Sequence, residues 1–184
     1  MKEMETERLR LRHYKMEDAD DLHRIIYSDD EVCRHFCQPG KTIEQVQRSM
    51  TYRICQYEQH QQFGHLAVIR KDDETLIGLV GIIPCLMWYH RFEGQDPRYN
   101  LIEVELMYAF GRAYQKKGYA IEACRSVIAY AFKDLRIPRI AYGVMKDNVN
   151  SWNLMQRLDF EHQQDLNPDN GADVNIGVLN NNMV

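Results

Sequence analysis

The spacing of apolar residues changes several times along the chain and marks out its secondary structure. Residues 8–12 alternate arginine with leucine, which is the pattern of a strand with one face in water. Apolar residues then recur every three or four positions in 16–26 and in 42–59, and this predicts two amphipathic helices. The second helix opens with Thr42 and carries Gln45 three residues later, so a capping box is expected at its start.

The rest of the chain is dominated by apolar runs of strand length, separated by polar segments or by glycine and proline. Residues 28–40 and 85–100 follow no regular period and are expected to be connectors. Strands are expected at 65–70, 76–84, 103–110, 139–145, 160–165 and 173–179, and a short helix at 148–158. Elements in this order predict a single α+β domain over residues 1–184, with a mixed, mostly antiparallel sheet.

Composition narrows the class of protein. The 184 residues are 45% hydrophobic and 27% charged, as is usual for one globular domain with a substantial core. A net charge of −4 argues against a nucleic-acid binder, which would normally be basic. There is no apolar run of membrane-spanning length and no signal-peptide core. The five cysteines are odd in number and lack framework spacing, so reduced thiols and a cytoplasmic location are expected.

Three potential metal ligands, Cys33, His35 and Cys37, lie close together in the sequence. A structural zinc site uses four ligands, and the chain offers no second ligand pair elsewhere to complete one. We therefore expect no metal site.

The stretch from Glu103 to Arg136 combines a predicted strand, a short loop and a predicted helix. The strand runs to Phe110, the loop carries a basic tip and ends at Gly118, and the helical period begins at Tyr119. This order of elements directs several backbone N–H groups toward an anion. Glycine at position 118 lets a phosphate oxygen approach the backbone, so we interpret the stretch as a pyrophosphate cradle.

The type of cradle follows from its glycines. The chain has no Walker-type phosphate loop, and Gly111 and Gly118 are wrongly spaced for a dinucleotide fingerprint. The loop instead reads Gln115-x-x-Gly118-x-Ala120 and resembles the Gln/Arg-x-x-Gly-x-Gly/Ala loop of the GNAT superfamily of N-acetyltransferases. Other stretches that resemble this family are 6–12, 105–108, 118–123, 144–151 and 158–160. The resemblance spans about the whole chain and is greatest to the branch that acetylates ribosomal-protein N-termini and small amines.

The resemblance implies a GNAT-like fold, in which helices flank the sheet and the fourth and fifth strands (103–110 and 139–145) splay apart. It implies acetyl-CoA as the cosubstrate, with the pantetheine arm between these strands and the diphosphate on the loop. The implied cofactor contacts are Tyr108, Ala109 and Phe110 on the strand, Gln115, Lys116, Lys117, Gly118, Tyr119 and Ala120 on the loop, and Asn148 and Ser151 at the later helix. Asp159 stands where the family has a glycine in a left-handed turn, a conformation that aspartate tolerates less well.

Acetyl transfer needs a neutral amine, donors for the oxyanion and a proton for the leaving thiolate. Glu103 and Glu105 are two residues apart and are expected on one strand face. Glu105 matches the family's recurrent glutamate and is the preferred base, acting directly or through a water. Both glutamates could instead be surface carboxylates in cross-strand pairs. The resemblance places the Ser151 hydroxyl near the sulfur as a proton donor, although Asn148 and Ser151 are also good helix caps.

We therefore expect an acetyl-CoA-dependent N-acetyltransferase that acts on a primary amine by direct attack. The acceptor is left open among a protein N-terminus, a polyamine, an amino acid and an aminoglycoside-like drug. His35, Trp88 and His90 lie in segments corresponding roughly to the family's acceptor pocket, with a packed aromatic lid as the alternative. Cys85 and Cys124 are expected to be core thiols. The alternative function is a non-catalytic acyl-CoA-binding or sensing domain, and a homodimer is compatible with the sequence.

Overall fold

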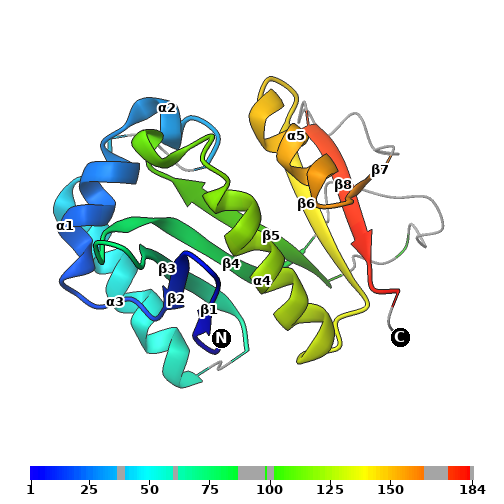
Figure 1. The fold of residues 1–184 in the computed structure, drawn as a ribbon, viewed down its shortest axis with the longest axis horizontal. Helices are drawn as coiled ribbons and strands as arrows, with labels where there is room; N and C mark the ends of the chain where they lie inside the picture. Colours follow the sequence, from blue (N-terminus) through cyan, green and yellow to red (C-terminus); the bar gives the residue numbers. More distant parts are fainter. Residues whose placement is uncertain (37–39, 60–61, 87–97, 99–101, 164–173, 183–184) are drawn as a thin grey trace. The chain divides into compact units, whose positions relative to one another are not determined.

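The computed structural model describes residues 1–36, 40–59, 62–86, 98, 102–163 and 174–182 (Figure 1). Its helices and strands follow the order that the apolar periods predict. In chain order they are β1 (Met4–Glu5), β2 (Leu9–Arg12), α1 (Asp18–Leu22), η1 (His23–Tyr27), α2 (Asp30–Cys33), α3 (Ile43–Gln59), β3 (Gly64–Arg70), β4 (Leu76–Leu86), β5 (Ile102–Phe110), η2 (Arg112–Tyr114), α4 (Tyr119–Lys133), β6 (Arg139–Met145), α5 (Val149–Arg157), β7 (Glu161–Gln163) and β8 (Val174–Asn180).

The eight strands join one sheet in the order β1-β2-β3-β4-β5-β6-β8-β7. The ladders β1–β2, β2–β3, β3–β4, β6–β8 and β7–β8 are antiparallel, whereas β5 and β6 run parallel. The described β5–β6 ladder holds the pair Glu105–Ala141, while every residue of β6 pairs with β8 on the other side. The mixed, mostly antiparallel sheet is therefore confirmed, and the splay of β5 from β6 stays a prediction.

The chain divides into two compact units, one of Met1–Ile82 with Met107–Val127 and the other of Ile83–Leu106 with Ile128–Val184. Each unit combines segments that are far apart in the sequence, because β4, β5 and α4 each contribute to both. The single-domain organisation expected from the sequence stays a prediction.

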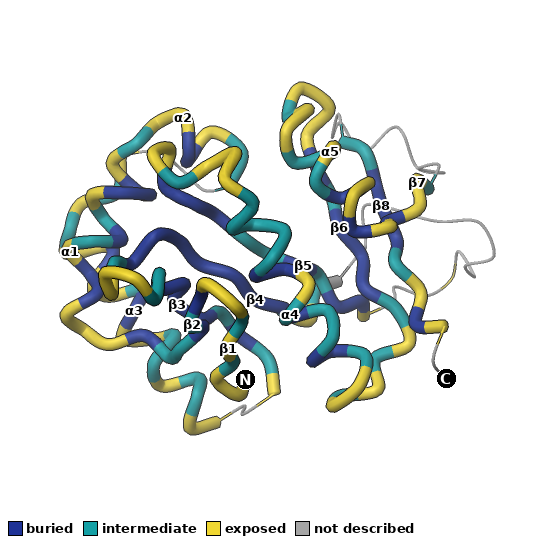
Figure 2. Tube along the Cα trace, in the orientation of Figure 1, coloured by how far each residue is buried: buried dark blue, intermediate teal, exposed yellow. Residues whose placement is uncertain are grey.

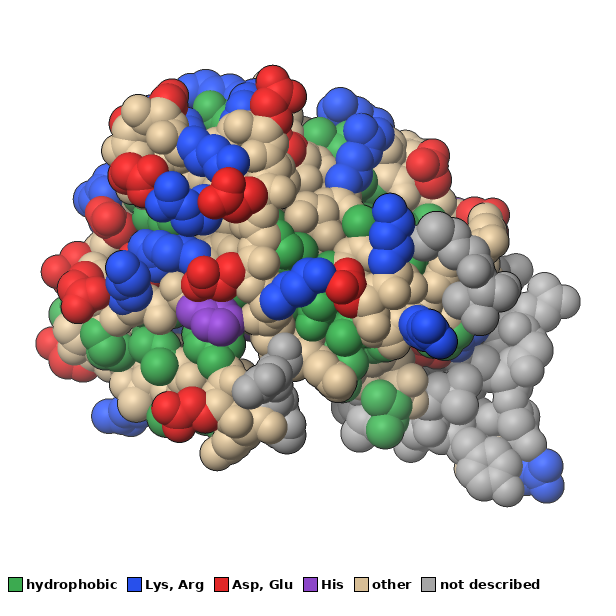
Figure 3. Space-filling view, turned by 60° about the horizontal axis from the view of Figure 1, so that its bottom comes forward, with side chains coloured by type: hydrophobic (Ala, Val, Ile, Leu, Met, Phe, Trp, Pro, Cys, Tyr) green, Lys and Arg blue, Asp and Glu red, His purple; other side chains and the backbone are tan. Residues whose placement is uncertain are grey.

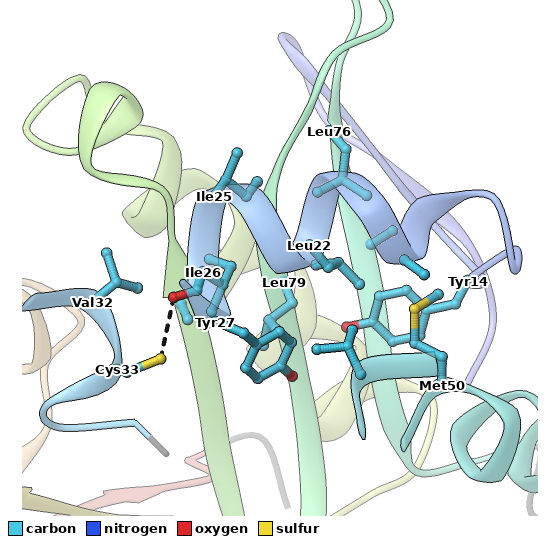
Figure 4. Close-up of a cluster of buried hydrophobic side chains, with 14 of the residues drawn as sticks. Tyr14, Leu22, Ile25, Ile26, Tyr27, Val32, Cys33, Met50, Leu76 and Leu79 are labelled. Carbon is cyan, nitrogen blue, oxygen red and sulfur yellow. Dashed lines mark hydrogen bonds between the residues drawn. The ribbon is translucent and has the colours of Figure 1, made fainter. Parts of the chain in front are cut away.

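In the first unit, helices α1 and α3 cover β3 and β4 through a buried apolar cluster (Figure 4). Leu66 and Val68, which alternate in β3 with the cluster residues Ala67 and Ile69, are also fully buried. The strand is therefore covered on both faces, which explains its nearly continuous apolar sequence and its dark trace in Figure 2. The cluster comprises Tyr14, Ala19, Leu22, Ile25, Ile26, Tyr27, Val32, Cys33, Val46, Met50, Ala67, Ile69, Leu76, Leu79 and Ala109.

Two helical features of residues 18–33 differ from the sequence-based expectation. The first helix ends as an α-helix at Leu22 and continues as the wider π-turn η1. Each residue of a π-turn advances by a smaller angle than in an α-helix, so Tyr27 is brought closer to the apolar face and is buried. The segment expected to be an irregular connector also contains the four-residue helix α2, whose first amides are capped by the Asp29 side chain.

The expected capping box of α3 is confirmed. The Thr42 N–H donates to Gln45 Oε1 at 2.8 Å, and the Gln45 N–H donates to Thr42 Oγ1 at 3.4 Å. The helix then buries Val46 and Met50, which lie on the apolar stripe that the sequence predicts.

The second unit is built around β6 and β8. Ala141, Ile176 and Val178 form its buried apolar cluster, and the half-buried Cys85 packs against it. After β8, the Asn181 Nδ2 group donates to the Ile137 carbonyl at 3.0 Å, which fixes this end of the strand. β7 ends at Gln163, and residues 164–173, where part of two strands and their turn are expected, lie outside the described residues.

Charged side chains of both signs are interspersed on the face shown in Figure 3, in keeping with the small net charge of −4. Among the described helices, none has both the length and the apolar composition that crossing a bilayer requires.

Candidate functional site

The expected anion-binding loop follows β5 directly. The short helix η2 leads to Gln115, whose side-chain Nε2 donates to the Phe110 carbonyl at 3.0 Å and ties the loop to the strand end. Lys116 and Gly118 then adopt left-handed conformations, with φ of 60° and 84°. Alternating backbone handedness turns successive N–H groups toward the same side, which creates a concave site for an anion.

Gly118 is required by the backbone for reasons that the sequence did not show. Its positive φ is unfavourable for other residues, and a Cβ would lie 3.2 Å from Nη2 of Arg8. α4 begins at the next residue, Tyr119, as expected. The first amides of a helix have no acceptor within it, so those of Tyr119 and Ala120 are available to a ligand.

The end of β5 is held tightly against the start of β4. Ala109 and Phe110 are buried, and the Gly111 N–H donates to the Ile77 carbonyl at 3.0 Å. A Cβ on Gly78 would lie 2.5 Å from the Ala109 carbonyl oxygen, so this close approach requires glycine. The strand end that leads into the loop is therefore rigidly placed.

The two glutamates of β5 have different surroundings. Glu103 is only 4% exposed and forms an ion pair with Arg139, in which the guanidinium Nε lies 2.9 Å from Oε2. Glu105 is half-buried and lies near the backbone N–H of Gly143. Burial raises the pKa of Glu105, and this effect outweighs the opposing effect of the Gly143 N–H. A carboxylate with a raised pKa is better matched to accepting a proton near neutral pH.

The cysteine thiols are poorly suited to nucleophilic catalysis. Burial, helped by the nearby charges of Glu105 and Glu103, raises the pKa of Cys85 to about 12. Burial alone raises the pKa of Cys124, a core residue as expected. Both therefore remain thiols at neutral pH, whereas the thiolate is the reactive form. Cys85 is half-buried at the edge of an apolar cluster and less deep than expected.

Asn148 and Ser151 begin α5 as a helix cap. The Asn148 Oδ1 atom accepts a hydrogen bond from the Ser151 N–H at 3.2 Å. This capping role was the structural alternative to cofactor contact. The bond uses the amide oxygen of Asn148 and the backbone of Ser151, so the Asn148 amide hydrogens and the Ser151 hydroxyl can still serve a ligand.

The departure at Asp159 keeps the geometry of the family's glycine. Asp159 has φ of 64°, in the left-handed region. The Asp159 N–H donates to the Gln156 carbonyl, and the Phe160 N–H donates to the Met155 carbonyl at 3.0 Å. These two bonds form a Schellman motif, so the helix ends as predicted despite the substitution.

The predicted residues fall in both units. The first unit holds Tyr108, Ala109, Phe110 and the loop, and the second holds Glu103, Glu105, Asn148 and Ser151. His35 follows α2, whereas Cys37, Trp88 and His90 lie outside the described residues. Within the described ranges, no group of three or more His, Cys, Asp or Glu residues could hold a metal ion.

Sequence reasoning missed the partners of the acidic residues. Arg139 pairs with Glu103, and Arg8 pairs with Glu122 in the first turn of α4. The available signals were the basic residue that opens the predicted strand at 139 and the arginines that alternate in residues 8–12. Neither signal identifies its partner in the sequence.

The comparisons with known proteins agree with this geometry. The model of the acetyltransferase (GNAT) domain matches residues 8–161. An uncharacterized N-acetyltransferase of Bacillus licheniformis, p20, is 30% identical over 164 residues, which make up 89% of this chain and 84% of p20.

Solved structures share the fold at lower identity. A GNAT-family acetyltransferase from Bacillus anthracis has a TM-score of 0.77 and 18% identity, covering 98% of this chain and 99% of its own. RimL, a ribosomal-protein α-N-acetyltransferase in complex with coenzyme A, has a TM-score of 0.73 and 13% identity, and the match covers 97% of this chain and 98% of RimL. A Vibrio cholerae spermidine N-acetyltransferase in complex with CoA and spermine has a TM-score of 0.70 and 17% identity, and the match covers 96% of this chain and 97% of that enzyme. With a domain match over most of its length, this chain belongs to the GNAT acetyltransferase family, as its loop motif predicts.

Proposed function

We propose that the protein transfers the acetyl group of acetyl-CoA to a primary amine by direct attack of the amine on the thioester. Membership of the GNAT family gives the general class of reaction. The observation that carries the proposal is the loop before α4, where the left-handed Lys116 and Gly118 lead into the helix N-terminus. Backbone amides arranged in this way suit a diphosphate.

The residues of the loop fit the cosubstrate. The backbone amides of residues 116–120 would hold the diphosphate, and the exposed side chains of Lys116 and Lys117 add positive charge. Gln115 supports the loop through its bond to Phe110. Backbone groups of Tyr108, Ala109 and Phe110 would hold the pantetheine arm, with the Asn148 amide as a further contact. When bound, acetyl-CoA supplies an activated acyl thioester, so a covalent acyl-enzyme is unnecessary.

Glu105 is the proposed general base. It accepts the proton that the amine nitrogen loses during attack, and its pKa is raised by burial, which favours this proton transfer. Glu103 is committed to Arg139 and is proposed to support the strand rather than to exchange protons. Ser151 is the proposed donor of the proton that the leaving thiolate takes up.

The acceptor is proposed to be the amine of a peptide N-terminus or of a polyamine. Two proteins of similar fold suggest this: RimL, a ribosomal-protein α-N-acetyltransferase, and a spermidine N-acetyltransferase. We also propose a cytoplasmic location, where thiols stay reduced, since the described cysteines Cys33, Cys55, Cys85 and Cys124 are free thiols. Homodimerisation stays a prediction.

The test combines binding with turnover. Calorimetry should show a complex with acetyl-CoA, and release of free thiol should accelerate when an N-terminal peptide or spermidine is added. An amino acid and an aminoglycoside complete the acceptor panel. Binding without thiol release for every amine would favour the acyl-CoA-sensing alternative, and absence of binding would reject both functions.

A further inference from the structure

Three residues connect the N-terminal strands to the first turn of α4. The Thr6 hydroxyl donates to Glu122 Oε1 at 2.6 Å, and the Arg8 backbone N–H donates to the same oxygen at 2.9 Å. The Arg8 guanidinium donates from Nε to Glu122 Oε2 at 2.7 Å. Both carboxylate oxygens of Glu122 are thus occupied, and the side chain of Arg8 is held in a fixed direction.

Arg8 extends from this anchor to the loop itself. Its Nη1 atom donates to the Lys117 carbonyl at 3.0 Å. The guanidinium also lies over the Tyr119 ring, 4.6 Å from the ring centroid. Arg8 therefore contacts the residue before Gly118 and the residue after it.

The bond to the Lys117 carbonyl has a consequence for the next amide. Lys117 C=O and Gly118 N–H belong to one planar trans peptide unit, in which they point in opposite directions. With the carbonyl held toward Arg8, the Gly118 N–H faces away from the Arg8 guanidinium. An anion that binds on the side of the loop opposite Arg8 would therefore meet this N–H.

We propose that Arg8, anchored by Glu122 and Thr6, is a positioning residue that sets the backbone of residues 117–119 for binding the diphosphate of coenzyme A. This inference rests on the proposed function of the loop. Arg8 acts from behind the loop, through the peptide unit, and the ligand meets the opposite side.

Arg8 has a second role, which is to offset the negative charge of Glu122. Burial raises the pKa of Glu122, but the hydrogen bonds from Thr6 and Arg8 together lower it by more, so the pKa lies below its ordinary value. The carboxylate is therefore ionised at neutral pH in the first turn of α4, close to where the diphosphate is proposed to bind. Arg8 offsets this charge, and its removal would leave the carboxylate to repel the ligand.

The experiment measures steady-state kinetics with two acetyl donors, acetyl-CoA and acetyl-pantetheine, which lacks the diphosphate. Arg8→Met should raise the KM for acetyl-CoA by roughly 10- to 100-fold, with a much smaller change in kcat and in acetyl-pantetheine kinetics. Arg8→Lys should recover part of the loss, because lysine restores the charge without the planar fork. The double variant Arg8→Met/Glu122→Gln should bind acetyl-CoA more tightly than Arg8→Met alone.

Arg10→Met is the matched control, since Arg10 lies two residues from Arg8, on β2, and pairs with Glu74. This substitution should leave the KM and kcat for both acetyl donors unchanged. An unchanged acetyl-CoA KM in Arg8→Met would overturn the proposal. So would an equal loss with both donors and a lowered Tm, which would indicate a general structural role. If Arg8→Met does not fold, Glu122→Gln and Arg8→Lys are compared in the same way. Failure of the unmodified protein to bind acetyl-CoA would reject the proposed function itself.

Discussion

Arg139, the first residue of β6, binds the carboxylate of Glu103 on β5 through two guanidinium nitrogens, with Nε 2.9 Å from Oε2. Two residues further along β5, Glu105 is half-buried beside the backbone N–H of Gly143. Glu103 is thus neutralised by an opposite charge, while Glu105 keeps a half-buried carboxylate with a raised pKa. This difference separates two residues that the sequence could place only on the same strand face.

Glu105→Gln tests the proposed base. We expect kcat to fall by about 100-fold or more, because a general base typically contributes roughly 10²- to 10⁴-fold and the amide accepts no proton at neutral pH. The KM for acetyl-CoA should change by less than about twofold, since Glu105 is not among its proposed contacts. Steady-state rates and calorimetry measure the two effects separately. An unchanged kcat would show that the amine is deprotonated without this carboxylate.

Glu103→Gln should have the opposite outcome. The substitution leaves the partly buried Arg139 without its carboxylate and should lower the free energy of unfolding by about 1–3 kcal/mol, less than for a fully buried pair. The kcat should remain close to that of the unmodified protein. Urea denaturation at pH 8 provides the measurement, and Glu105→Gln serves as the control. A large loss of kcat at normal stability would instead assign catalysis to Glu103.

The pH dependence of the reaction follows from the raised pKa of Glu105. Glu105 must be ionised to accept a proton, and burial raises its pKa above the ordinary value of 4.5. The rate should therefore fall on acidification with a component whose midpoint lies above 4.5. This component should be absent in Glu105→Gln, whereas protonation of the amine affects both proteins. The stabilising contribution of a group with a raised pKa is full below its unfolded pKa and is lost as pH rises through the folded one. Glu105→Gln should accordingly be at least as stable as the unmodified protein at pH 8.

Local sequence signals predicted the elements that matter most for the site. The period changes abruptly at Gly118, so the start of α4 at Tyr119 was predictable, as were the bounds of β6. The capping box at Thr42 and Gln45 was also predictable, because both partners lie within one helical turn of each other in the sequence.

The features that were missed depend on contacts between distant segments. Arg8 and Glu122 are 114 residues apart, and 36 separate Glu103 from Arg139. An arginine in a strand pattern indicates a wet face, but the carboxylate that it meets is determined by the fold. The π-turn of η1 likewise depends on how Tyr27 packs in the core rather than on the apolar spacing alone.

The left-handed Asp159 offers a route to a more stable protein. Asp159→Gly should raise the free energy of unfolding by about 0.5–1 kcal/mol, because glycine adopts this conformation without steric cost. Asp159→Ala should have the reverse effect. Gln156→Gly, within α5, is the control for glycine itself and should destabilise by about 1 kcal/mol. Thermal unfolding of the three variants should show this order, and destabilisation by Asp159→Gly would contradict it.

His65 gives the protein a specific sensitivity to acid. Its Nδ1 atom is buried and has no hydrogen-bond partner among the described residues. Burial, with a smaller effect from the charge of Arg53, lowers the pKa of His65 from 6.5 to about 3. Between these values the unfolded chain binds a proton that the folded protein excludes. The stabilising contribution is therefore complete above pH 6.5 and is lost as pH falls toward 3.

His65→Leu removes this group and should flatten the dependence of stability on pH. For the unmodified protein, the contribution of His65 should fall by roughly 2 kcal/mol between pH 7.5 and pH 5. Urea denaturation at both values, in both proteins, isolates this contribution, because carboxylates and the other histidines are common to them. The leucine variant should lose less stability on acidification, whatever its stability at pH 7.5. Parallel losses in the two proteins would show that His65 is hydrated or protonated in the folded state.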